Sequence, residues 1–140
     1  MPRLITGYGD LYPHTPAFFA ERTSNYTTGT GLTTIQLNNV VVDTTSGWDT
    51  TNYVWVVPMT GKYLVSGAIT ATGTGWELVI SKNGSQHTTF DQATYRSATH
   101  SIVMDLVKGN NIGLQKYAGV GIEIRGRSDS GTYLSAILIG

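Results

Sequence analysis

The chain has 140 residues, no cysteine and equal numbers of basic and acidic side chains, nine of each, so its formal net charge is zero. This length is enough for one domain with a hydrophobic core, and the absence of cysteine excludes disulfides and thiolate metal sites. Charged residues make up only 13% of the sequence, so no basic stripe favours a nucleic acid or an anionic membrane as a partner.

Threonine is abundant and there are 17 glycines. Threonine, valine, isoleucine and tyrosine suit a pleated sheet, and glycine suits tight turns. No sustained apolar repeat at helical spacing occurs along the chain. The composition therefore predicts an all-β protein.

Residues 1–16 are predicted to form an irregular N-terminal arm, because glycines and prolines interrupt them. The arm carries five apolar or aromatic side chains: Leu4, Ile5, Tyr8, Leu11 and Tyr12. This content is too apolar for a simple disordered tail. Two interpretations remain open: the arm docks on a neighbouring subunit or another protein, or it folds back on its own domain. The arm lacks an apolar stretch of signal-peptide length, so we expect synthesis in the cytoplasm without Sec export.

Short apolar segments separated by turn residues follow the arm. The predicted strands cover residues 17–21, 33–42, 53–57, 62–69, 76–81, 101–107, 112–117, 122–125 and 132–140. Asn83-Gly84 is a strong hairpin signal after one of them. Roughly eight to ten short strands at this spacing predict a two-sheet sandwich or jelly roll. We assign residues 17–140 to this single domain.

The last predicted strand is apolar on both of its alternating faces. One face carries Tyr133, Ser135, Ile137 and Ile139, and the other carries Leu134, Ala136 and Leu138. A half-solvated strand would be polar on one face. We therefore expect one face to be covered by the partner sheet and the other by a second copy of the chain.

Several motifs, in their order along the chain, resemble the C1q/TNF-like jelly-roll superfamily. Ala17-Phe18-Phe19-Ala20 resembles the opening Ala-Phe-x-Ala strand, and residues 57–66 resemble the Pro-x-x-Gly-x-Tyr-x-Phe-Ser signature. Residues 78–84 end in the family's Lys-Asn-Gly, residues 104–110 resemble Leu-x-Leu-x-x-Gly-Asp, and residues 132–138 resemble the closing strand. Three departures are Leu64 for an aromatic residue, Asn110 for aspartate and Ala136 for glycine.

The resemblance covers residues 17–140 and implies a jelly-roll β-sandwich that assembles as a compact homotrimer around an apolar sheet edge. The predicted trimer-interface residues are Leu134, Ala136, Leu138 and Tyr117. Trimers of this kind are recognition heads or rigid shells, so the resemblance also implies a protein that is not an enzyme.

No group of side chains has the spacing of an active site. The three histidines, His14, His87 and His100, form no metal-binding pair, and the aspartates form no calcium ladder. The Gly-x-Ser-x-Gly motif of hydrolases is absent. Glu77 and Glu123 lie on separate strands and read as exposed positions, although a glycosidase-like carboxylate pair is the alternative. We expect no enzymatic activity, no cofactor and no metal.

The aromatic residues divide into two groups. Trp55, Trp76 and Tyr133 occupy positions expected to face the core. Trp48 lies in a turn beside Gly47, and Tyr95 lies next to Arg96 within residues 86–99, which we predict to be a long polar loop. Exposed aromatic rings in loops stack on sugars or protein partners. Trp48, Tyr95 and Arg96 are therefore the candidate recognition residues.

These features favour a bacteriophage capsid decoration (cement) protein, a homotrimer on the virion surface. Its arm would dock on another virion structural protein such as the major capsid protein. The alternative is a receptor-binding head of a tail or head fibre that recognises a host surface glycan or protein. An enzyme such as a polysaccharide depolymerase is the third and least favoured class.

Overall fold

The structure is a computed structural model that describes residues 15–73, 75–90, 96–127 and 131–140. Within these ranges the chain contains thirteen β-strands and no α-helix, which confirms the predicted all-β fold. No helix of the described part is long and apolar enough to cross a membrane.

The strands follow one another along almost the whole described chain. In order they are β1 (Ala17–Glu21), β2 (Tyr26–Thr27), β3 (Gly31–Thr34), β4 (Asn39–Asp43), β5 (Trp48–Asp49), β6 (Val54–Val56), β7 (Gly61–Thr70), β8 (Glu77–Lys82), β9 (Ser85–Phe90), β10 (Ser97–Leu106), β11 (Asn111–Ala118), β12 (Glu123–Ile124) and β13 (Tyr133–Leu138).

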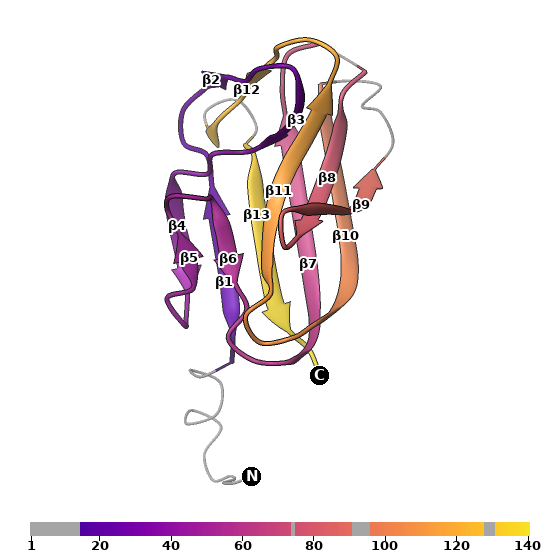
Figure 1. Ribbon diagram of the computed structural model, residues 1–140. Helices are drawn as coiled ribbons and strands as arrows, with labels where there is room; N and C mark the ends of the chain where they lie inside the picture. Colours follow the sequence, from indigo (N-terminus) through magenta and orange to yellow (C-terminus); the bar gives the residue numbers. More distant parts are fainter. Residues whose placement is uncertain (1–14, 74, 91–95, 128–130) are drawn as a thin grey trace, which may run out of the picture.

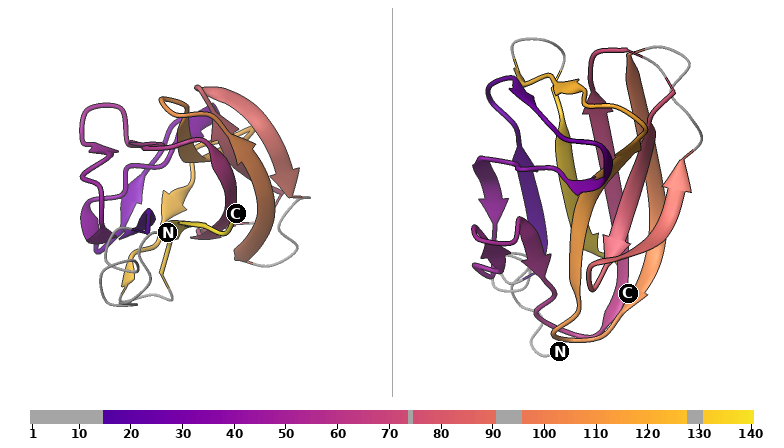
Figure 2. Two further views of the ribbon diagram at one scale, coloured as in Figure 1. Left: turned by 90° about the horizontal axis from the view of Figure 1, so that it is seen from below. Right: turned by 45° about the horizontal axis from the view of Figure 1, so that its top comes forward.

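Two antiparallel sheets pack against each other as the layers of a sandwich (Figures 1 and 2). The five-stranded sheet has the order β10-β7-β13-β1-β4. The six-stranded sheet has the order β5-β6-β11-β8-β9, and β3 also pairs with β11. The short pair β12-β2 lies at the upper end in Figure 1. The last strand, β13, lies between β7 and the first strand, β1, so the predicted jelly-roll sandwich is confirmed.

The core lies between the two sheets and takes alternate residues from the longer strands, β1, β7, β8, β10, β11 and β13. Trp55 and Trp76 are fully buried there, as predicted, together with Tyr63. The ring of Trp55 stacks on Phe18 at 5.5 Å between centroids and meets Tyr63 edge-on at 5.9 Å. Aromatic contacts of this kind add to the free energy gained from burial alone. These rings tie β1, β6 and β7 together at the centre of the molecule.

The predicted strand over residues 33–42 is two strands that belong to different sheets. β3 pairs with β11 in the six-stranded sheet, whereas β4 pairs with β1 in the five-stranded sheet. Between them the chain crosses the core, and Ile35 and Leu37 are buried on the way. A buried segment that crosses between sheets has the same apolar composition as a strand, so the sequence pattern does not separate the two.

The predicted hairpin at Asn83-Gly84 is confirmed. Both residues have positive φ, 53° and 81°, and Lys82 pairs with Ser85 across the turn. The turn joins β8 to β9. The predicted loop over residues 86–99 is wrong, because β9 extends to Phe90 and β10 begins at Ser97. Threonine- and serine-rich segments can pair as strands even when they carry few apolar residues.

Lys116 is a charged side chain in an otherwise apolar layer. It lies on the core-facing side of β11 and is fully buried. Its Nζ donates hydrogen bonds to the carbonyl oxygen of Gly29 and, at 3.3 Å, to that of Gly31. Burial lowers the pKa of the Lys116 ammonium below 10.5. The lysine thus holds the loop before β3 onto the sheet while carrying a desolvation cost.

Replacing Lys116 with methionine should change how stability depends on pH. The pKa of Lys116 is lower in the folded chain than in the unfolded chain, so the unfolded chain holds more protons between the two values. The free energy of unfolding of the wild type should therefore rise with pH in the window below 10.5, relative to Lys116→Met. Each unit by which the pKa of Lys116 differs between the folded and the unfolded chain corresponds to about 1.4 kcal/mol in the free energy of unfolding.

Urea unfolding of both proteins at neutral pH and just below pH 10.5 measures this difference. Burial raises the pKa values of Tyr26 and Tyr63, but these groups titrate in both proteins and cancel in the comparison. Parallel pH profiles for wild type and variant would show that Lys116 keeps its ordinary pKa.

Candidate functional site

The outward side of the five-stranded sheet carries a group of apolar side chains. We define the exposed sheet face as the outward side chains of Ala17, Phe19, Leu64, Val103, Tyr133, Ile137 and Ile139. Leu64 is 39% exposed, Ile137 43%, and Val103 and Ile139 each 54%. Large aliphatic side chains gathered in this way on one surface mark an interaction site more often than scattered single ones do.

The strand register places these side chains in rows across the sheet. Ala17 pairs with Ile137, Ile137 with Leu64, and Leu64 with Val103, which gives one apolar row over four strands. Directly paired side chains stand about 5 Å apart. The row is therefore a continuous apolar strip rather than four isolated side chains.

Polar side chains flank this strip. On one side, the hydroxyl groups of Ser66 and Ser101 lie 2.7 Å apart and form a hydrogen bond. On the other, Lys62 and Asp105 form an ion pair at 2.7 Å between two exposed side chains. The Lys62 ammonium lowers the pKa of the Asp105 carboxyl through this hydrogen bond. An apolar strip with polar neighbours is the common anatomy of a protein–protein interface.

The prediction that Leu134 and Ala136 lie in the trimer interface is wrong. Both are buried within a single chain, with 0% and 3% of their surfaces exposed, and belong to the core. Ala136 stands opposite Phe18 and Val65, which are also core residues. Leu138, on the same face, is half-buried against the core. The face of β13 that a second copy can cover is the opposite one, with Ile137 and Ile139.

Two further aromatic residues lie elsewhere than the sequence suggested. Tyr133 was expected in the core, but it is on the exposed sheet face, half-buried beside Phe19 at 5.4 Å between ring centroids. Tyr117 is 50% exposed and points outward from β11, in the other sheet. It lies across from Leu32, which is 44% exposed. The role of Tyr117 in an interface stays a prediction.

Trp48 is partly a structural residue. Its ring stacks on Phe18 at 5.1 Å, and its backbone N–H donates to the Asp43 carboxylate at 2.9 Å. The same carboxylate accepts hydrogen bonds from the Gly47 N–H and from Trp55 Nε1. Asp43 therefore organises the turn before β5.

The remaining side of Trp48 lines an open groove of about 430 Å³ with Pro58 and Lys108. Of the other candidate recognition residues, Arg96 is exposed just before β10, and Tyr95 lies outside the described residues. The arm residues Leu4, Ile5, Tyr8, Leu11 and Tyr12 also lie outside them. β5 and β10 are edge strands of different sheets, so no common recognition loop contains Trp48 and Arg96.

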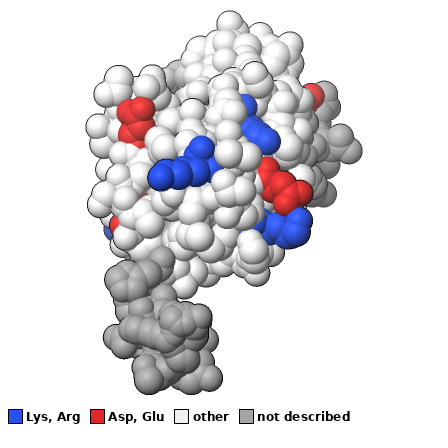
Figure 3. Space-filling model, turned by 60° about the horizontal axis from the view of Figure 1, so that its bottom comes forward, with Lys and Arg blue, Asp and Glu red and all other residues white. Residues whose placement is uncertain are grey.

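The surface carries few charges. On the face in Figure 3, lysine, arginine, aspartate and glutamate are sparse and the two signs are interspersed. Among the residues that the structure describes, no group of three or more histidine, aspartate or glutamate side chains could hold a metal ion.

The antiparallel two-sheet sandwich defines the chain as a jelly-roll module. The chain belongs to the C1q domain family, whose model matches residues 17–139. Domains of this C1q/TNF-like class are typically trimeric and non-enzymatic. The predicted membership of the C1q/TNF-like superfamily is thereby confirmed.

Solved structures share the fold at low sequence identity. The globular domain of zebrafish complement 1qA is 15% identical with a TM-score of 0.64, covering 89% of this chain and 98% of that one. Eiger TNF from S. frugiperda is 13% identical with a TM-score of 0.68, covering 90% and 93%. Murine APRIL is 18% identical with a TM-score of 0.63, covering 88% and 99%. No curated protein matches the sequence significantly. At these identities the similarity concerns the fold alone.

Proposed function

We propose that the protein is a homotrimeric, non-enzymatic structural or binding module whose subunits associate through the exposed sheet face. The apolar strip of Leu64, Val103 and Ile137 carries this proposal, because a single chain leaves it in contact with water. Covering such a strip gains roughly 25 cal/mol per Å² of apolar surface. Because C1q/TNF-like domains are typically trimeric, we expect three copies of the chain to associate rather than two.

Light scattering of the purified protein tests the oligomeric state. The expected mass is three times that of the chain, constant over a wide range of concentration. A monomer at micromolar concentration would contradict the proposal.

More specifically, we propose that the trimer decorates a bacteriophage capsid as a cement protein. Three features support this role: the absence of cysteine, the low charge and the apolar side chains within residues 1–16. A cement protein adds contact area between neighbouring capsid subunits, and an interface of about 1,600 Å² suffices for stable attachment. In this role the arm is the tether to the major capsid protein.

Deleting residues 1–16 should separate attachment from assembly. The truncated protein should remain trimeric, because the exposed sheet face lies entirely within the remaining domain. It should no longer sediment with empty capsids of the virus that encodes it, and it should not raise their melting temperature. Undiminished capsid binding by the truncated protein would show that the arm is not the tether.

The second candidate function is a receptor-binding head of a phage fibre. The groove beside Trp48 favours it, because an exposed aromatic edge next to Pro58 and Lys108 suits a sugar or a peptide. Purified protein should then block phage adsorption to host cells. A cement protein should leave adsorption unchanged, so this measurement distinguishes the two roles.

A further inference from the structure

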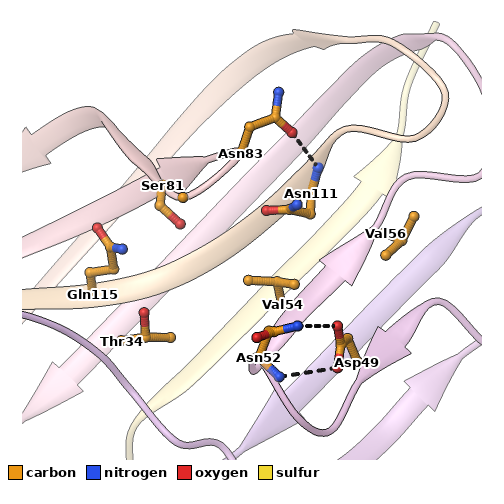
Figure 4. Close-up of a pocket in the computed structure, with 10 residues that line it drawn as sticks. Thr34, Asp49, Asn52, Val54, Val56, Ser81, Asn83, Asn111 and Gln115 are labelled. Atoms are coloured by element: carbon orange, nitrogen blue, oxygen red, sulfur yellow. Dashed lines mark hydrogen bonds between the residues drawn. The ribbon is translucent and has the colours of Figure 1, made fainter.

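A polar pocket of about 340 Å³ lies on the outward side of the six-stranded sheet (Figure 4). Hydroxyl and amide side chains dominate its lining: Thr34, Asn52, Ser81, Asn83, Asn111 and Gln115. They come from β3, β8 and β11, from the turn between β8 and β9, and from the turn between β5 and β6. The volume falls within the range of small-molecule sites. The pocket is formed by one subunit and by the sheet that does not carry the exposed sheet face.

The register of the sheet explains how the pocket stays open. Ser81 on β8 pairs with Gly113 on β11, so the Ser81 side chain lies over a residue that has none. A Cβ at position 113 would stand 2.8 Å from Ser81 Oγ and 3.2 Å from Val54 Cγ1. Glycine at this position therefore leaves the room that Ser81 and Val54 occupy at the floor of the pocket.

Two buried oxygen atoms of the pocket residues have no hydrogen-bond partner among the residues that the structure describes. They are Ser81 Oγ and Gln115 Oε1, on residues that are 1% and 6% exposed. Buried polar atoms are nearly always paired in folded proteins, because an unpaired one costs stability. Both residues line the same pocket, on neighbouring strands. A partner from outside the chain would satisfy both oxygens together.

The other polar groups are largely held in place by the chain itself. Both carboxylate oxygens of Asp49 accept hydrogen bonds, from the Thr51 N–H and from the backbone and side-chain N–H groups of Asn52. Asn83 Oδ1 accepts the Asn111 N–H at 3.0 Å. These hydrogen-bonded residues at the edge of the pocket are therefore held in place before any ligand binds, which lowers the entropy cost of binding.

The lining also restricts the chemistry of a ligand. No lysine or arginine lines the pocket, so it does not suit an anion. Its one carboxylate, Asp49, is already surrounded by N–H donors, so it does not suit a cation. Hydroxyl and amide side chains both donate and accept hydrogen bonds, as the hydroxyl groups of a sugar do. Val54 and Val56 supply apolar contacts for the C–H groups of such a ring.

We propose that this pocket binds a neutral, hydroxyl-rich small molecule of monosaccharide size, with ligand hydroxyl groups bonded to Ser81 Oγ and Gln115 Oε1. Both oxygens are buried in the unliganded chain, so binding includes a rotation of the Ser81 and Gln115 side chains toward the ligand. The site is complete within one subunit. It therefore does not depend on trimer formation or on capsid attachment.

Nuclear magnetic resonance titration of the ¹⁵N-labelled full chain tests the proposal. The probes are D-glucose, D-galactose, D-mannose and N-acetyl-D-glucosamine, each added separately, with sodium sulfate as the anionic probe. At least one sugar should shift the Gln115 side-chain amide and the Ser81 backbone amide saturably, with a Kd on the order of 1 mM. Sulfate should shift neither. Saturable shifts on addition of sulfate would overturn the proposal. The absence of saturable shifts with all four sugars would overturn it as well.

Two pocket variants and one control complete the test. Ser81→Ala and Gln115→Leu should each weaken sugar binding roughly tenfold, the equivalent of one hydrogen bond. Both should keep or raise the melting temperature, because each removes an unpaired buried oxygen. Gln36→Leu, the same substitution at an exposed position outside the pocket, should leave binding unchanged. Unchanged binding in Ser81→Ala would refute the site even if Gln115→Leu fails to fold.

Discussion

Replacing Leu64 with aspartate should convert the proposed trimer into a folded monomer. Leu64 is at the centre of the apolar strip, paired with Ile137 on one side and Val103 on the other. A carboxylate here would be buried without a partner in each of three subunits, and each buried, unpaired charge costs several kcal/mol. The single chain should tolerate the change, because the Leu64 side chain is 39% exposed and lies outside the core. Light scattering gives the mass, and circular dichroism reports whether the monomer stays folded.

Val120→Asp is the matched control for this experiment. Val120 is 66% exposed and lies in the loop after β11, away from the exposed sheet face. The same kind of substitution there should leave the mass unchanged. If Leu64→Asp still forms trimers as tightly as the wild type, the subunits associate through some other surface.

Replacing Trp55 with alanine should cause the largest loss of stability of any single substitution considered. The indole ring is fully buried, stacks on Phe18 and donates from Nε1 to the Asp43 carboxylate at 3.0 Å. Truncating a buried tryptophan to alanine costs roughly 3–5 kcal/mol. Trp55→Phe keeps a ring in the core and loses only the donor and part of the volume, so its cost should be clearly smaller. Urea unfolding at equal chain concentration measures both, because the stability of an oligomer depends on concentration.

Val120→Ala provides the comparison for this series. Val120 is 66% exposed and outside the core, so its truncation should change the free energy of unfolding by less than about 0.5 kcal/mol. A loss below about 1 kcal/mol for Trp55→Ala would mean that Trp55 and the two rings that contact it, Phe18 and Tyr63, do not form the centre of the core.

The last strand shows what the two-residue periodicity of a strand can predict and what it cannot. The alternation of side chains separates residues 133–139 into two apolar sets without ambiguity, and one set does remain open to water in the single chain. Which set points inward depends on the strands that flank β13, and these are Ala17–Glu21 and Gly61–Thr70. Their own inward residues, Phe18 and Val65, pair with Ala136. The sequence-based choice of Leu134 and Ala136 as interface residues failed for this reason.

The polar pocket shows a different limit. Ser81 and Gln115 are 34 positions apart in the sequence, and no motif contains both of them. Only the pairing of β8 with β11 brings them to one pocket, and only the burial of their oxygens distinguishes them from ordinary polar strand residues. The nearest local signal was the Asn83-Gly84 turn, which positions the rim but does not indicate a site.

By itself the sequence determined the all-β class, most strand segments, the Asn83-Gly84 hairpin and the superfamily, because these depend on local conformational preference and on motif order. The tertiary structure decided which face of each apolar strand is inside, where the chain crosses between sheets at Ile35 and Leu37, and which polar side chains share a pocket. Those features depend on the register between strands that are distant in sequence. A pattern that repeats every two residues fixes which side chains lie together, but only neighbouring strands fix which side of the sheet meets water.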